Sequence, residues 1–197
     1  MVVKRLRKED RRVQLLEVAR GIVRQQGTEA LTLGYLAERA CVTKPIPYDH
    51  FGDREGLLMA LYQDFSDTQL KKFRATLAVD NKTLENTIRF FSAAYIDCAI
   101  SAGPETGPIA AALSGSRALL AFRETCVADC ANCLRSALAP YVVLKGVRGE
   151  AALTAIIGAA DALSSAASSG ALARHVAEDM LSGAMSGVLE VYADNTK

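Results

Sequence analysis

The chain has 197 residues, of which 50% are hydrophobic and 6% aromatic, and its formal net charge is +1. This length suits one ordinary domain, or one small and one medium unit, with a sizeable core. The first residues, MVVKRLRKEDRR, are charged, and no apolar stretch follows at the spacing of a signal peptide. We therefore expect a cytoplasmic protein with reduced cysteines instead of a disulfide framework.

The most apolar region, residues 151–172, has the length of a membrane span. Asp161 lies in its middle, and serines are frequent around it. An ionisable residue is costly inside a bilayer, so the pattern favours a core helix over a membrane segment. We expect no membrane partner.

Charge is distributed unevenly along the chain. Residues 1–54 carry 11 Lys and Arg against 7 Asp and Glu, whereas residues 55–197 carry 12 against 15. A basic arm ahead of a helix is a common electrostatic footprint for nucleic acid. A solvated tail would have the same composition, so charge by itself leaves both interpretations open.

The first third of the chain shows three helical patterns. Residues 10–27 form an amphipathic helix that ends at Gly27, with an apolar face at Val13, Leu16, Ala19, Ile22 and Val23. A second, two-turn helix starts after Thr32, a good N-cap, and a third starts after Thr43 and ends at Gly52. The tight turn over 40–42 makes the last two a helix-turn-helix unit, with the third as the recognition helix.

Two prolines lie in the predicted recognition helix. Pro45 falls in the first turn, where an N–H has no intrahelical partner, so nothing is lost there. Pro47 would be the fourth helical residue if the helix began at Lys44, and its ring would compete with the first backbone bond. We therefore expect an irregular or later start.

The remaining segments also have helical periodicity. Asp53 caps a fourth helix over 54–78, a fifth follows over 83–101, and Gly and Pro residues break the chain over 103–108. Residues 109–139 are mostly helical, and two helices over 150–169 and 171–193 finish the chain. The pattern predicts an all-α protein of about nine helices, with a helix-turn-helix domain over 1–52 and a body over 53–197.

The stretch 31-LTLGYLAERACVTKPIPYDHFGDREGLL-58 resembles the TetR family of bacterial transcriptional regulators. Cys41 stands where that family usually has Gly, and Pro47 stands where it usually has Leu, Ile or Val. The resemblance implies a non-enzymatic DNA-binding regulator without a cofactor, most often a repressor. It also implies a homodimer that binds a palindromic operator, associates through its last two helices, and binds a small-molecule effector in its body. The matching residues are Leu31, Thr32, Leu36, Ala37, Val42, Thr43, Lys44, Tyr48, His50, Phe51, Arg54, Glu55 and Leu58.

Several residues are candidates for contact with double-stranded DNA. Lys44 can reach a phosphate or a guanine edge, and Tyr48 and His50 can donate to phosphate oxygens. The basic arm could lie in the minor groove. The full predicted set is Arg5, Arg7, Thr32, Thr43, Lys44, Tyr48, His50 and Arg54.

The body should enclose an apolar effector pocket. Its candidate lining residues are Phe65, Phe90, Phe91, Tyr95, Cys98, Leu120, Phe122 and Cys126. Two stripes of small and apolar residues on the last helices fit a dimer interface, although they could also be intramolecular core. These stripes are Leu153, Ile157, Ala160, Ser164 and Ala167, and Val176, Met180, Gly183, Gly187 and Val191.

The cysteines allow an alternative function. Cys126, Cys130 and Cys133 share one helical face that Cys98 could meet, which would suit a thiol or soft-metal sensor. Free cysteine is often just a small buried hydrophobe, and the spacing is not that of a zinc ribbon, so we expect no metal. An enzyme lacks support, because the sequence shows neither a nucleophile–base set nor a phosphate loop. The outward polar face around Lys44 argues against a peptide-binding adaptor.

Overall fold

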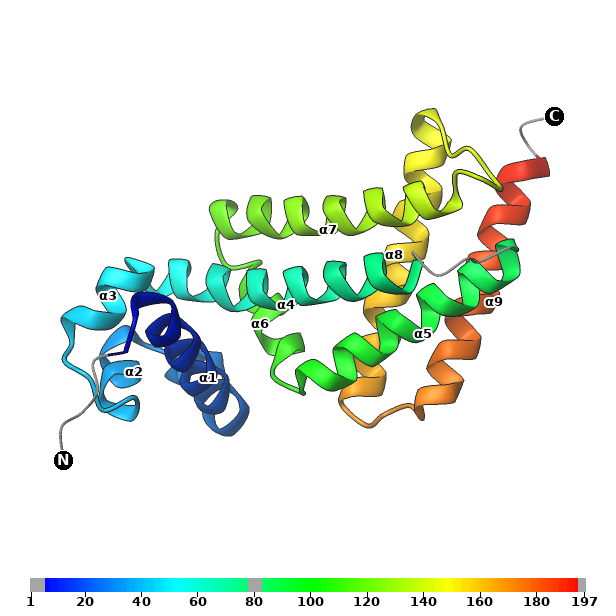
Figure 1. Cartoon of the computed structure of the whole chain (residues 1–197). Coiled ribbons are helices and arrows are strands. Elements are labelled where there is room, and N and C mark those ends of the chain that lie inside the picture. The colour runs from blue at the N-terminus through cyan, green and yellow to red at the C-terminus, as the bar shows by residue number, and fades with distance from the viewer. Residues whose placement is uncertain (1–5, 78–82, 195–197) are drawn as a thin grey trace. The chain divides into compact units, whose positions relative to one another are not determined.

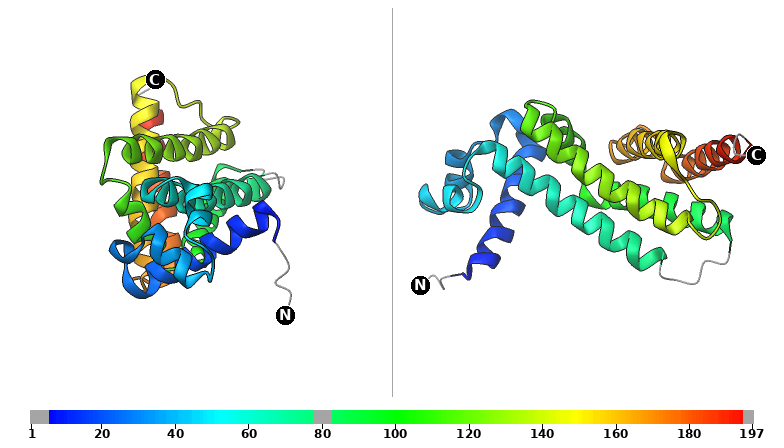
Figure 2. Two further views of the ribbon diagram at one scale, coloured as in Figure 1. Left: turned by 90° about the vertical axis from the view of Figure 1, so that its left-hand side faces the viewer. Right: turned by 90° about the horizontal axis from the view of Figure 1, so that it is seen from above.

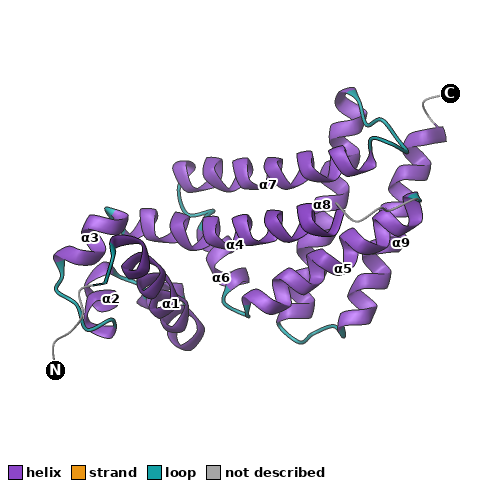
Figure 3. Cartoon of the chain, viewed as in Figure 1, coloured by secondary structure: helices purple, strands orange, loops and turns teal. Residues whose placement is uncertain are grey.

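The computed structural model describes residues 6–77 and 83–194, and every regular element in these ranges is helical (Figure 3). This confirms the all-α prediction. Arg5, one of the predicted DNA-contact residues, lies outside the described residues.

The helices follow one another along the chain as labelled in Figure 1. They are α1 (Lys8–Gln26), the 3₁₀ helix η1 (Thr28–Ala30), α2 (Leu33–Arg39), α3 (Pro45–Phe51), α4 (Arg54–Leu77), α5 (Leu84–Ala102), α6 (Thr106–Ala112), α7 (Arg117–Leu138), α8 (Gly146–Ser168) and α9 (Arg174–Asp194).

Chain contacts divide these helices into two compact units. The first unit comprises Met1–Asp64 and Glu105–Arg123, and the second comprises Phe65–Pro104 and Glu124–Lys197. This division differs from the boundary at 52/53 expected from the sequence, because α4 and α7 each contribute residues to both units.

The first unit has a core built by α1, α2, α3 and the start of α4. The α1 face consists of Leu15, Leu16, Ala19, Ile22 and Val23, all at most 5% exposed. Val13, which the pattern placed on this face, is instead 67% exposed. Leu15 takes the core position because, at 3.6 residues per turn, it lies closer to the centre of the stripe that Ala19 and Ile22 define.

The second unit packs α5, α8 and α9 against one another, and Figure 2 shows α8 and α9 side by side. Large buried side chains from α4, α5 and α7 extend this core. In the described ranges, α8 has the length and composition of a membrane span. One face of α8, including Leu153, Ile157 and Ala160, is buried in this core, as is usual for a helix of a helical bundle.

Proline positions explain where two helices begin. α3 starts at Pro45, one residue later than Lys44, and Pro47 is therefore its third residue and is buried. At that position the missing N–H costs no hydrogen bond. The later start that the sequence suggested is confirmed, but Thr43 is not the cap, since Lys44 occupies the N-cap position. Likewise α6 starts at Thr106 inside the predicted break, because Pro108 falls in its first turn.

Candidate nucleic-acid interface

The outward face of α3 carries exposed polar side chains. Thr43 and Lys44 immediately precede the helix and are exposed, and Tyr48 is 52% exposed. Lys44 and Tyr48 are four residues apart, so their side chains lie on one side of the helix. This face presents an ammonium group and a phenol, both donors suited to phosphate oxygens or base edges.

α1 holds the end of α3 in place. The Arg12 guanidinium donates to the His50 carbonyl at 3.1 Å and lies 5.0 Å from the centroid of the buried Phe51 ring. His50 is half-buried, and burial, followed by the charges of Lys8 and Arg12, lowers the pKa of its imidazole. The lowered pKa favours the neutral imidazole, and His50 is less accessible than Tyr48, so its contact with DNA stays a prediction.

Thr32 caps α2, as predicted. Its hydroxyl oxygen accepts the Tyr35 backbone N–H at 3.1 Å, and the side chain is exposed. Gln26 donates to the Tyr35 hydroxyl at 2.9 Å, which ties the end of α1 to α2. The hydroxyl proton of Thr32 can still be donated outward, so its contact with a phosphate stays a prediction.

Arg54 has intramolecular partners that the sequence did not reveal. Its Nε donates to the Leu31 carbonyl at 3.0 Å, and its Nη2 donates to the Thr28 carbonyl at 2.8 Å. These bonds hold the start of α2 and η1 against the first turn of α4. The structure thus gives Arg54 a positioning role, while its predicted DNA contact stays a prediction.

Gly56 lets α4 approach the end of α3 closely. A Cβ built at Gly56 would lie 2.0 Å from the Phe51 carbonyl oxygen. The first turn is capped by Asp53, whose Oδ1 accepts the Gly56 N–H at 2.8 Å, as predicted for this Asp. The role of Gly56 could not be predicted from the sequence, because a close backbone approach leaves no local signal beyond the glycine itself.

The turn between α2 and α3 contains a left-handed residue. Cys41 has φ +53° and is exposed. This conformation suits glycine, the residue that TetR proteins usually have here, and it costs a residue with a Cβ some stability.

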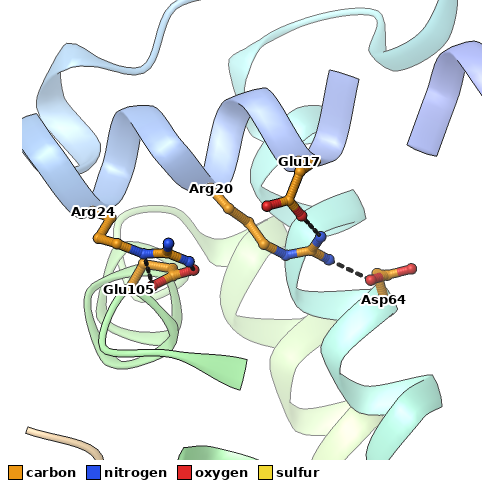
Figure 4. Close-up of polar contacts among 5 residues, drawn as sticks. All are labelled: Glu17, Arg20, Arg24, Asp64 and Glu105. Carbon is orange, nitrogen blue, oxygen red and sulfur yellow. Dashed lines mark hydrogen bonds and ion pairs between the residues drawn. The ribbon is translucent and has the colours of Figure 1, made fainter. Parts of the chain in front are cut away.

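Ion pairs join α1 to α4 and α6 within the first unit (Figure 4). Arg20 pairs with Glu17 and Asp64, and Arg24 grips Glu105, at the N-terminus of α6, with two bonds of 2.5 and 3.0 Å. The Glu105 side chain is 1% exposed. Burial alone would raise the pKa of Glu105, but the hydrogen bond and the charge of Arg24 together lower it by more. The net result is a pKa below the ordinary value of a glutamate.

The predicted arm is shorter than expected. α1 begins at Lys8, and Arg7, its N-cap residue, is exposed and pairs with Asp10 at 3.0 Å. Arg11 and Arg12 therefore lie on a helix instead of in a tail. A contact of Arg7 with the minor groove stays a prediction.

The predicted effector residues fall into two groups. Leu120 and Phe122 belong to the first unit, where Leu120 is 40% exposed and Phe122 contacts Tyr62 edge-on at 6.4 Å. The others lie in the second unit. Of these, Phe65 is half-buried and Phe90 is exposed, while the buried members are Phe91, Tyr95, Cys98 and Cys126.

Phe91 and Tyr95 form an aromatic cluster with Phe73, which is not among the predicted pocket residues. Phe73 of α4 is fully buried, and its ring centroid lies 4.9 Å from Phe91 and 5.5 Å from Tyr95. The Tyr95 hydroxyl donates to Asp161 of α8 at 2.6 Å. A helical repeat of apolar positions along α4 could have indicated Phe73.

The cysteines are poorly suited to sensing. Burial raises the pKa of the Cys98, Cys126, Cys130 and Cys133 thiols, so the reactive thiolate is disfavoured at each. Across residues 6–77 and 83–194, no cluster of three or more His, Cys, Asp and Glu side chains is placed to hold a metal ion. Neither observation supports the thiol- or metal-sensing alternative.

Only one of the two predicted dimer stripes faces outward in the described part of the chain. The α8 stripe of Leu153, Ile157, Ala160, Ser164 and Ala167 is buried in the core of its own unit, so its assignment to an interface was wrong. On α9, Val176, Met180 and Val191 are 37–64% exposed, and Gly183 and Gly187 are exposed beside them. The α8 face that points outward carries Val147, Ala151, Ala155 and Gly158.

An apolar groove of about 560 Å³ runs between the exposed faces of α8 and α9. Ala151, Ala155, Gly187 and Val191 line it, and Arg148 borders it. We call these exposed parts of the two helices the α8–α9 face.

Comparison with protein-family models found one match in the first unit. Residues 15–61 match the model described as "Bacterial regulatory proteins, tetR family". The match runs from within α1 to the first part of α4 and includes α3, Arg54 and Gly56, whereas Arg12 precedes it. Comparison with curated proteins found no match.

Solved structures similar to this chain share its fold at low sequence identity. A TetR-like transcriptional regulator from Rhodococcus sp. RHA1 is 16% identical, with a TM-score of 0.75 over 94% of this chain and 99% of that one. A tetR-family regulator from Streptomyces coelicolor is 22% identical, with a TM-score of 0.73 over 95% and 83%. The fatty acid degradation regulator FadR from Bacillus halodurans is 16% identical, with a TM-score of 0.72 over 91% and 97%.

Proposed function

We propose that this chain, which belongs to the tetR family of bacterial regulatory proteins, is a cytoplasmic repressor without enzymatic activity. As a homodimer it binds a palindromic DNA operator, and a small apolar effector releases it. The observation that carries the proposal is the exposed pair Lys44 and Tyr48 on one side of α3. Transcription regulation by a DNA-binding helix-turn-helix is the activity of this family.

The proposed DNA contacts divide by chemistry. Lys44 reaches a phosphate or a guanine edge, and Tyr48 positions the helix by donating to a phosphate oxygen. His50 adds a neutral donor at the rim, and Thr32 adds a hydroxyl near the start of α2. Arg12 and Arg54 stabilise the backbone beneath this face by donating hydrogen bonds to the carbonyls of His50 and Leu31.

The α8–α9 face supports dimerisation. It combines apolar side chains with glycine and alanine, which allow helices of two subunits to approach closely. A two-fold dimer places two copies of α3 about 34 Å apart along the DNA, one helical turn, which matches the symmetry of a palindrome.

Effector release is a shift between two populations of the dimer. α4 carries Gly56 against the end of α3, and farther along the same helix it carries Phe73 inside the second unit. An effector bound beside Phe73 therefore acts on the helix that supports the recognition helix. The apolar interior favours an apolar effector, and the similar FadR structure comes from a regulator of fatty acid degradation.

Operator binding is tested by fluorescence anisotropy with DNA from upstream of the gene for this protein and with a scrambled copy, each at two salt concentrations. Tyr48→Ala should weaken binding to the upstream DNA about ten-fold, the loss of one well-placed polar contact. Tyr141→Ala, an exposed tyrosine of the second unit, is the control and should bind as the wild type. Equal binding to both DNAs, unaltered by Tyr48→Ala, contradicts the proposal.

Dimerisation is tested by analytical ultracentrifugation of two matched variants. Met180→Glu places a charge on the α8–α9 face at a residue that is 57% exposed. Val143→Glu places the same charge at a loop residue that is 56% exposed. Only Met180→Glu should produce monomers and weaken DNA binding, and a dimer that survives Met180→Glu would contradict this interface.

A further inference from the structure

One polar group inside the second unit lacks a hydrogen bond. The Gln69 side chain on α4 is buried, at 5% exposure, and within the described structure its Nε2 has no hydrogen-bond partner. A primary amide has two N–H donors, and a buried donor without an acceptor destabilises a fold. Natural cores seldom keep such a group without a use for it.

The neighbours of Gln69 on the same face of α4 have partners. Ser66, 6% exposed, hydrogen-bonds through its hydroxyl to the Cys126 sulfur of α7. Phe73 stacks on Tyr95 of α5, with the ring centroids 5.5 Å apart. Gln69 lies between these two positions along α4, so its donors belong to the interior formed by α4, α5 and α7.

The charged and neutral groups around this interior indicate which kind of ligand could bind there. Burial raises the pKa of the Cys126 and Cys130 thiols, which stay neutral at pH 7. Asp161 accepts the Tyr95 hydroxyl, and its charge raises the pKa of Cys130. The charges of the exposed Lys72 and Arg74 instead lower the pKa values of Cys98 and Cys133, against the larger effect of burial. A buried charge of either sign is costly, and a cationic ligand would also bring further donors instead of an acceptor for Gln69, so a neutral acceptor fits this interior best.

We propose that the Gln69 amide is the polar anchor of the effector site, and that the effector is a neutral, largely apolar molecule with a carbonyl oxygen, such as a ketone, ester or lactone. The carbonyl accepts a hydrogen bond from Nε2, and the chain of the molecule packs against the Phe73, Phe91 and Tyr95 rings. This inference rests on the effector-responsive function proposed above and adds the chemical class of the effector. Because the donor is unsatisfied without the effector, the bound state gains a hydrogen bond that the free state lacks.

The test compares three probes that carry the same heptyl chain, 2-nonanone, octanoate and heptylammonium, by isothermal titration calorimetry. Wild-type protein should bind 2-nonanone about ten-fold tighter than the other two, and Gln69→Met should abolish this preference, since one interior hydrogen bond is lost. Gln63→Met, on the same helix in the first unit, is the control and should keep the preference. Failure of 2-nonanone to bind, equal binding of all three probes, or a preference kept by Gln69→Met overturns the proposal.

A second readout is an NMR titration of the wild-type protein, with Gln69→Leu used only to assign the signals. The side-chain ¹⁵N–¹H₂ resonances of Gln69, assigned by their absence from the spectrum of Gln69→Leu, should shift when 2-nonanone is added. Resonances that stay in place would mean that an ordered water satisfies the amide, which contradicts an anchor role. Anisotropy with upstream DNA, measured without any probe, separates the two proposals, because intact operator binding with no probe response refutes the anchor and leaves the DNA-binding function standing.

Discussion

In the first unit, arginine side chains hold the backbone around α3, whereas packed aromatic rings stabilise the interior of the second unit. Arg12 and Arg54 donate to the carbonyls of His50 and Leu31, and Arg24 forms two bonds with the buried Glu105. In the second unit, Phe73 packs on Phe91 and Tyr95. Directional bonds fix a recognition surface, while apolar contacts without a fixed direction allow an interior to admit a ligand.

The largest expected effect comes from filling the close approach between α3 and α4. Gly56→Ala places a Cβ against the Phe51 carbonyl. We therefore expect the free energy of unfolding to fall by about 3 kcal/mol. The affinity for DNA should fall as well. Gly21→Ala is the control, because no atom lies within 4 Å of its Cβ position. Urea unfolding and DNA anisotropy measure both effects, and a Gly56→Ala protein as stable as Gly21→Ala would contradict the packing described.

The second-largest effect should come from replacing the Arg54 guanidinium, which donates to two backbone carbonyls at once. Arg54→Lys cannot serve the carbonyls of Leu31 and Thr28 together, so we expect about 1–2 kcal/mol lower stability by urea unfolding. Arg89→Lys controls for the change of side chain, because the hydrogen bond of Arg89 to Asn86 is exposed. Equal stability of the two variants would mean that Arg54 does not position α2.

The contribution of the Arg24–Glu105 ion pair to stability should depend on pH. Because the pKa of Glu105 lies below its ordinary value of 4.5, the ionised carboxyl stabilises the fold above that pH, and this contribution is lost as the pH falls through the lowered pKa. Glu105→Gln should cost about 1 kcal/mol at pH 7, since Arg24 is half-exposed and its charge is screened. The difference from the wild type should shrink below pH 4.5. Unfolding curves at pH 7 and at lower pH test this, and a difference independent of pH would contradict it.

The smallest expected effect is a gain in stability. Cys41→Gly removes a Cβ from a left-handed residue and should raise the unfolding free energy by about 1 kcal/mol. Cys41→Ala keeps the Cβ and should leave the stability unchanged. A Cys41→Gly protein less stable than Cys41→Ala in urea would show that the turn is not strained.

Local signals in the sequence predicted much of the first unit. Thr32 and Asp53 cap the helices that follow them, and Gly52 ends α3, because capping depends on residues within one turn. The same local reasoning failed at Thr43, since the prolines shift the start of α3 to Pro45.

Contacts between distant residues could not be predicted from one sequence. Arg24 and Glu105 are separated by 81 positions, and nothing near either residue indicates the other. The α8 stripe failed for a related reason, because periodicity shows that a face is buried but not whether its own unit or a second subunit covers it. Gln69 was overlooked because a single polar residue in an amphipathic helix normally faces solvent.

Hydroxyl-radical footprinting of the upstream DNA tests most directly the claim that two copies of α3 read an operator. We expect two protected segments centred about one helical turn apart, roughly 10 base pairs, and their loss with Tyr48→Ala. Protection that Tyr48→Ala leaves unchanged, or a single protected segment without two-fold symmetry, would contradict the claim.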